Sequence, residues 1–267
     1  MTSFWLALLA KMASSAAIVV AASLVVERSG PVIGALVATL PISAGPALAF
    51  LALEHSPDFL ARSTLASLAV NVGTAPYILV YAALAQSRGL LVSLGVAFAV
   101  WFGIAVTLAA MDLGIGVIAA LSAISYGGAF LLGRPYRYAP RAARARPGVW
   151  DVPARAAIVM TVVAAVVLSG RWLGPTAAGI VALLPVVLTS LILILHRRAG
   201  GPTTAAVLAN SIPGMVGFTI GLATLHLTVV PLGSTAALLI GLAVCVSWNA
   251  ALLAFAMWTA RRSSDRP

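Results

Sequence analysis

The chain has 267 residues, of which 62% are hydrophobic and only 8% are charged, and its mean hydropathy is +1.09. Soluble domains carry about 25% charged residues, so this composition excludes a soluble globular protein and indicates an all-α polytopic membrane protein. A net charge of +10 would point to nucleic acid in a soluble chain, but here the basic residues lie between apolar runs, where they orient a membrane protein.

Nine apolar runs are long enough to predict transmembrane helices. In chain order they cover about residues 4–26, 31–53, 64–85, 89–109, 113–132, 156–170, 174–195, 204–225 and 234–258. A cleaved signal peptide is the alternative for the first run, because Ala21-Ala22-Ser23 resembles a cleavage site. The run is longer than the apolar core of a signal peptide and no basic residue precedes it, which favours a retained helix.

The basic residues separate into two groups if all nine runs cross the membrane. One long hydrophilic connection, residues 133–156, contains six arginines and four prolines and is expected to bind anionic lipid head groups. Thirteen basic residues fall on the same face as this loop: Arg28, Arg88, Arg134, Arg137, Arg141, Arg144, Arg146, Arg155, Arg197, Arg198, Arg261, Arg262 and Arg266. Only Lys11, Arg62 and Arg171 fall on or near the other face. The positive-inside rule therefore predicts a multi-pass membrane protein with its N-terminus outside and its C-terminus in the cytoplasm.

Two Gly-Pro/Leu-Pro segments recur in the chain at a constant offset of 144 residues. Gly30-Pro31 and Leu40-Pro41 match Gly174-Pro175 and Leu184-Pro185. Softer matches follow. Asn71 precedes Pro76 as Asn210 precedes Pro213, at a smaller offset, and Trp101 and Trp248 lie in the fourth and ninth runs. These matches predict an internal duplication.

The duplication and the span count together predict an inverted repeat. Residues 1–110 form the first four-helix repeat, residues 111–133 a connecting transmembrane helix, and residues 134–155 the cytoplasmic Arg/Pro-rich loop. Residues 156–260 form the second repeat and residues 261–267 a cytoplasmic tail. An odd number of crossings precedes the second copy, so the two copies enter the membrane from opposite sides, which is typical of secondary transporters.

Each half resembles the small four-helix bacterial inner-membrane proteins of the GlpM type, in which a glycine-led second helix runs into a Leu-Pro or Phe-Pro break. The residues that carry the resemblance are 34–41, with their continuation to Leu53, and 179–185. The resemblance implies a four-helix unit, a location in a bacterial inner membrane, and little chemistry. This chain departs from that family because it is a fused double unit with a connecting helix.

Polar groups inside the predicted spans are the candidate substrate contacts. A proline within a span removes a backbone hydrogen bond, so the breaks at Pro41 and Pro185 are expected to free carbonyl groups near mid-depth. The candidate binding residues beside such breaks are Asn71, Thr74, Pro76, Asn210, Ser211, Pro213 and Asn249. Packing kinks and interhelical hydrogen bonds are the alternative interpretation of the same residues.

The acidic residues all lie near the predicted ends of spans rather than at the bilayer centre. Proton-coupled exporters of cationic drugs usually need a buried carboxylate, so that mechanism is disfavoured. Glu54, His55 and Asp58 are candidates for an outer gate, and a solvated loop is the alternative.

Two classes of function remain. The chain contains no HExxH motif, no paired intramembrane aspartates and no Cys/His cluster, so no enzymatic chemistry and no cofactor or metal site is predicted. The leading hypothesis is a transporter or lipid flippase for a neutral or anionic small molecule. The rival is a non-transporting scaffold or accessory subunit that binds anionic lipid or a cytoplasmic partner. A polar cavity between the halves would favour the first, and an interior with satisfied proline breaks would favour the second.

Overall fold

The computed structural model describes residues 2–28, 44–138 and 151–264, and every regular element in these ranges is a helix. The helices are α1 (Thr2–Arg28), α3 (Ala44–Glu54), α4 (Pro57–Asn71), α5 (Thr74–Leu84), α6 (Leu90–Ala110), α7 (Ile115–Leu132), the 3-10 helix η1 (Arg134–Arg137), α8 (Asp151–Leu173), α9 (Pro175–Ala182), α10 (Val186–Ala199), α11 (Gly201–Leu232) and α12 (Ser234–Ser264).

The described residues contain six helical segments long and apolar enough to cross a membrane. They are Pro57–Leu84, Leu90–Ala110, Ile115–Leu132, Pro175–Ala199, Gly201–Leu232 and Ser234–Thr259. Shorter apolar stretches lie in α1, α3 and α8. The prediction of an all-α, multi-pass membrane protein is confirmed at this level, whereas nine spans stay a prediction. Pro41 and the start of the second predicted span lie outside the described residues.

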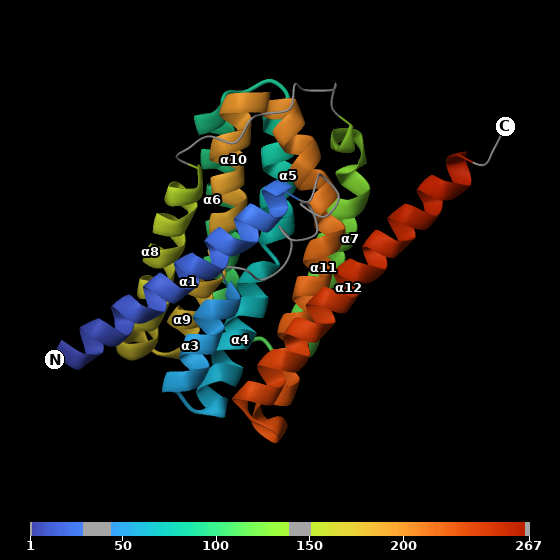
Figure 1. The fold of residues 1–267 in the computed structure, drawn as a ribbon. Coiled ribbons are helices and arrows are strands. Elements are labelled where there is room, and N and C mark those ends of the chain that lie inside the picture. The colour runs from blue at the N-terminus through green and yellow to red at the C-terminus, as the bar shows by residue number, and fades with distance from the viewer. Residues whose placement is uncertain (1, 29–43, 139–150, 265–267) are drawn as a thin grey trace.

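The broken segments α4–α5 and α9–α10 each run through the bundle in one direction. The reversals between the other successive helices gather at two ends of the bundle (Figure 1). The α3–α4, α8–α9 and α11–α12 connections lie at the lower end in Figure 1, and the α5–α6 and α10–α11 connections at the upper end. Three connections need only one residue each, Gly174 before α9, Gly200 before α11 and Gly233 before α12. Their φ angles are +87°, +83° and +79°, a left-handed conformation that glycine adopts without a Cβ clash.

The α4–α5 segment lies at the centre of the bundle. Of the most apolar 18-residue stretch of this segment, 72% is buried, compared with 22% of the corresponding stretch in α6 and in α7 and 17% in α12. Helix α11 packs along both α4 and α5 and also along α12, while α9 packs against α4 and α1 against α8. The helices with little buried surface therefore present their apolar side chains outward, as lipid-facing helices do.

Helix starts recur along the chain at a fixed spacing. Helix α4 begins at Pro57 and α11 at Gly201, which are 144 residues apart, and α6 begins at Leu90 and α12 at Ser234, which are also 144 apart. This is the spacing of the Gly-Pro/Leu-Pro pairs. The smaller offset expected from the Asn/Pro matches is therefore not the spacing of the helix starts.

Candidate functional site

The break between α4 and α5 follows from Pro76, which has no backbone N–H to donate to the carbonyl of Val72. The Ser125 hydroxyl of α7 donates to that carbonyl instead, over 2.7 Å, and the Tyr126 hydroxyl donates to the Asn71 carbonyl over 3.3 Å. Asn71 is only 1% exposed. Helix α7 therefore supplies the hydrogen bonds that the broken helix lacks.

The Asn71 side chain joins α4 to α11. Its Nδ2 donates to Thr219 Oγ1 over 2.9 Å, and the Thr219 hydroxyl donates to the Met215 carbonyl of its own helix. Thr74 is buried beside the break, at the first position of α5. The Asn71 amide thus forms an interhelical hydrogen bond, which is the alternative interpretation of this residue in the sequence analysis.

Asn210 lies in a different environment. It is exposed, and its Nδ2 donates to the Ala206 carbonyl one turn earlier and to the Arg137 carbonyl of η1. Thr219, the partner of Asn71, follows nine residues later, which is roughly 14 Å along the helix axis. The structure therefore does not bring these two candidate binding residues together in one site.

Pro213 does not break α11, which continues as one helix from Gly201 to Leu232. The Trp248 Nε1 of α12 donates to the Pro213 carbonyl over 2.8 Å. Ser211 donates to the Leu208 carbonyl of its own helix, and the buried Asn249 donates to the Cys245 carbonyl. The polar atoms predicted around Pro213 are thus engaged in local and helix–helix hydrogen bonds.

The second predicted break is present, because α9 ends at Ala182 and α10 begins directly after Pro185. The Thr189 hydroxyl donates to the Pro185 carbonyl and also shares a hydrogen bond of 2.9 Å with the Tyr77 hydroxyl of α5. One turn further along α5, the Tyr81 hydroxyl lies 2.7 Å from His196 Nδ1. Both tyrosine side chains are 0% exposed.

Sequence reasoning missed this α5–α10 contact. Two tyrosines spaced four residues apart in an otherwise aliphatic span were the available indication, since a buried tyrosine hydroxyl usually has a partner.

Helices α4 and α9 approach each other closely. Ser63 donates to the Pro175 carbonyl over 2.8 Å, and Ser67 donates to the Gly179 carbonyl over 2.9 Å. A Cβ on residue 179 would lie 2.1 Å from the Ser63 carbonyl oxygen. Glycine is therefore required here for the two backbones to pack together, as is common between transmembrane helices.

The predicted outer-gate residues cluster at the α3–α4 turn. Glu54 forms an ion pair with Lys11 of α1, and His55 stacks on Phe59 with ring centroids 3.8 Å apart. Asp58 is exposed in the first turn of α4. These contacts tie α1 to α3 at one end of the bundle.

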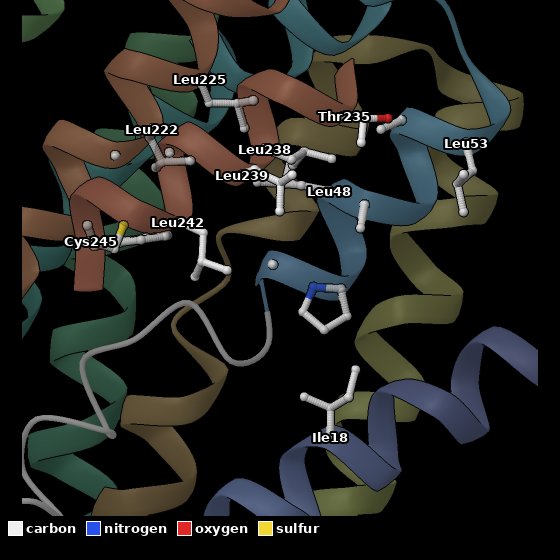
Figure 2. Close-up of a pocket in the computed structure, with 17 residues that line it drawn as sticks. Ile18, Leu48, Leu53, Leu222, Leu225, Thr235, Leu238, Leu239, Leu242 and Cys245 are labelled. Atoms are coloured by element: carbon white, nitrogen blue, oxygen red, sulfur yellow. The ribbon is translucent and has the colours of Figure 1, made fainter. Parts of the chain in front are cut away.

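A cavity of about 590 Å³ lies between α1, α3, α11 and α12. Figure 2 shows Leu53 and Thr235 at one end of it and Leu242 and Cys245 at the other. Thr235 is the only one of its 17 lining residues whose side chain carries oxygen or nitrogen. None of the substrate contacts predicted from the sequence lines this cavity, because an apolar lining gives no pattern that distinguishes it from a lipid-facing surface.

Comparison with known proteins finds no matching family model, no matching curated protein and no matching solved structure. The function is therefore argued from the geometry of this chain.

Proposed function

We propose that the chain is a membrane transporter or lipid flippase for a neutral or anionic small molecule, working by alternating access between two inverted halves. The halves are residues 1–110 and 156–260, with residues 111–133 as the connecting helix. In this proposal each half corresponds to one GlpM-like four-helix unit.

The repeated helix starts support the duplication, and a matched side-chain contact adds to it. A Cβ on Gly73 would lie 3.2 Å from Trp101 Cδ1, and a Cβ on Gly217 would lie 2.4 Å from Trp248 Cδ1. The two glycines are 144 residues apart and the two tryptophans 147 apart, and each glycine accommodates a tryptophan from the next long helix of its own half. The two halves thus share a contact that the apolar composition alone does not explain.

Packing across the halves supports the same arrangement. Helix α1 of the first half packs on α8 of the second half. The α4–α5 segment of the first half packs on α11 of the second half. Corresponding helices of the two halves therefore lie against one another. Contacts of this kind are expected when two inverted repeats pack around a pseudo-twofold axis in the membrane plane.

The observation that carries the proposal is a difference between two spaces in the bundle. Residues at the first space lie 144 positions in sequence from residues at the second. In one, Tyr77 contacts Thr189 and Tyr81 contacts His196, which fills the space between α5 and α10. At the positions related by 144, Gly221 and Gly45 correspond to Tyr77 and Thr189, and Leu225 and Ala52 correspond to Tyr81 and His196. All four of these smaller residues line the cavity. One of these two related spaces is therefore filled by aromatic side chains, whereas the other is hollow. A transporter that works by alternating access needs a space of this kind between its two halves.

The rival function, a non-transporting scaffold, is favoured by a separate observation. Carbonyls at the α4–α5 and α9–α10 breaks accept hydrogen bonds from Ser125, Tyr126 and Thr189. Satisfied breaks are what a purely structural kink requires. A scaffold would act through its Arg/Pro-rich loop, by binding anionic lipid or a cytoplasmic partner.

The positive-inside rule supports an orientation for either function. Arg88 lies in the α5–α6 connection and Arg197 and Arg198 in the last turn of α10, and the connections that follow these helices are at the upper end of the bundle in Figure 1. Glu54 and Asp58 flank the α3–α4 connection, which is at the lower end. We therefore assign the arginine-rich end to the cytoplasm and the Glu54–Asp58 turn to the outside, where this turn would gate the cavity.

A comparison of cells with and without the chain tests the proposal. Metabolites and lipids are measured on each side of the membrane, with Ala49→Trp as the test variant because Ala49 lines the cavity. Ala99→Trp is the matched control, since Ala99 is exposed on α6. We expect a compound whose distribution depends on the chain, and we expect Ala49→Trp but not Ala99→Trp to remove that dependence. If no metabolite or lipid changes its distribution, and the chain still binds a cytoplasmic partner through its arginine-rich loop, the scaffold function is correct.

A further inference from the structure

We infer that the cavity between α1, α3, α11 and α12 binds one acyl chain of a membrane phospholipid, with the phospholipid head group at the Lys11–Glu54 end. This inference rests on the proposed function for its role in transport, and on the geometry of the cavity for the binding itself.

The chemistry of the wall selects the ligand class. The lining is formed by leucines, alanines, glycines and a few other apolar residues, and Thr235 contributes the only hydroxyl. A sugar, nucleotide or amino acid bound there would leave most of its polar atoms without hydrogen bonds, which is unfavourable in a buried site. A saturated or unsaturated hydrocarbon chain has no such atoms, so it fits the wall along its whole length.

The dimensions match one chain in one leaflet. The lining residues of α12 run from Thr235 to Cys245, which is roughly 15 Å along the helix axis. The hydrocarbon core of a bilayer is about 30 Å thick, so the cavity extends through about one leaflet. Its volume of about 590 Å³ lies within the range of about 300–1,000 Å³ that is typical of small-ligand pockets.

Charged groups occur at one end of the cavity, where a head group would lie. Leu53 lines the cavity at the end that Figure 2 shows beside Thr235, and Glu54 is the next residue. Glu54 is paired with Lys11, whose Nζ also lies 5.7 Å from the centroid of the Phe50 ring. A phospholipid offers a phosphate to the ammonium group of Lys11, so an apolar cavity with this pair at its end complements both parts of the ligand.

Photo-crosslinking tests the inference in vesicles that contain the full-length chain. The probe is a phosphatidylethanolamine with a diazirine midway along one acyl chain, and the adducts are mapped by peptide mass spectrometry. We expect adducts on cavity residues such as Leu48, Leu242 and Cys245. Adducts confined to outward-facing residues such as Phe102 of α6, which is 63% exposed, would overturn the inference, because they report only surrounding lipid.

Two variants sharpen the test. Ala49→Trp places an indole in the cavity and should lower the adduct yield there at least five-fold, whereas Ala99→Trp should leave it unchanged. Equal yields in the two variants would overturn the inference. Lys11→Gln should weaken probe binding a few-fold, and unchanged binding would overturn the placement of the head group.

The same vesicles separate this inference from the proposed function. If cavity adducts form but no head-group-labelled lipid crosses the bilayer, the acyl-chain site stands and transport fails. If the chain moves a water-soluble metabolite and no cavity adduct forms, transport stands and the acyl-chain site fails.

Discussion

Replacing Gly179 with alanine is expected to destabilise the protein, because it separates α9 from α4. The new Cβ would lie 2.1 Å from the Ser63 carbonyl oxygen, whereas ordinary contacts begin at 3.4 Å. The two helices must therefore move apart by more than 1 Å, and the hydrogen bonds from Ser63 and Ser67 to α9 lengthen with them.

The magnitude combines three effects. Overpacking costs about 1–3 kcal/mol, and the two weakened hydrogen bonds add roughly 0.6 kcal/mol each, the average measured between transmembrane helices. Alanine in place of glycine within a helix returns about 0.5–1 kcal/mol. The expected net loss is about 1–4 kcal/mol in the free energy of unfolding.

Gly103→Ala is the matched control. Residue 103 lies within α6, and a Cβ there would contact nothing within 4 Å. This variant should therefore be unchanged or up to about 1 kcal/mol more stable, since only the helix propensity differs.

Thermal unfolding is followed with a thiol-reactive fluorescent dye, because the single cysteine, Cys245, is only 3% exposed and reacts when the fold opens. Gly179→Ala should unfold roughly 3–10 °C below the wild type. Equal unfolding temperatures for Gly179→Ala and Gly103→Ala would show that α4 and α9 are not in close backbone contact.

Three further predictions follow from the geometry. With the native cysteine replaced, an impermeant thiol reagent on intact cells should label Asp112→Cys and not Ser87→Cys, and labelling of the second site alone would reverse the orientation. Trp248→Phe should lower the free energy of unfolding by about 1 kcal/mol more than Trp101→Phe does. The reason is that the Trp248 indole donates to a carbonyl, whereas the buried Trp101 indole has no hydrogen-bond partner. Equal losses in the two variants would contradict this assignment. Asn71→Leu should cost about 1 kcal/mol through the lost bond to α11, measured by the same dye assay, and a wild-type unfolding temperature would show that the amide does not hold the helices together.

Several features of the fold are readable from the sequence. Low charge and long apolar runs determine the class, because a bilayer excludes unpaired charges and requires helices of about 20 residues. Each of the nine predicted runs coincides, within its described part, with an apolar helical segment. The break beside Pro185 is also local, since it follows from a missing N–H at one position.

The site was less accessible from sequence. A soluble helix shows which face is buried by its polar side, but a helix in lipid is apolar on every face. Asn71 and Asn210 accordingly look alike in sequence, and only packing separates them: one is buried against Thr219, and the other is exposed beside η1.

The sequence by itself determined the membrane class, the proline break before α10 and the 144-residue spacing, because each depends on composition or on a covalent property of single residues. Tertiary structure decided which of the two spaces related by the 144-residue spacing is filled by side chains and which is hollow. Tyr77 and Tyr81 meet Thr189 and His196 across more than 110 residues, while the smaller residues 144 positions away leave a cavity. No local pattern encodes that difference, because it arises from the volumes of side chains on separate helices once those helices are packed together.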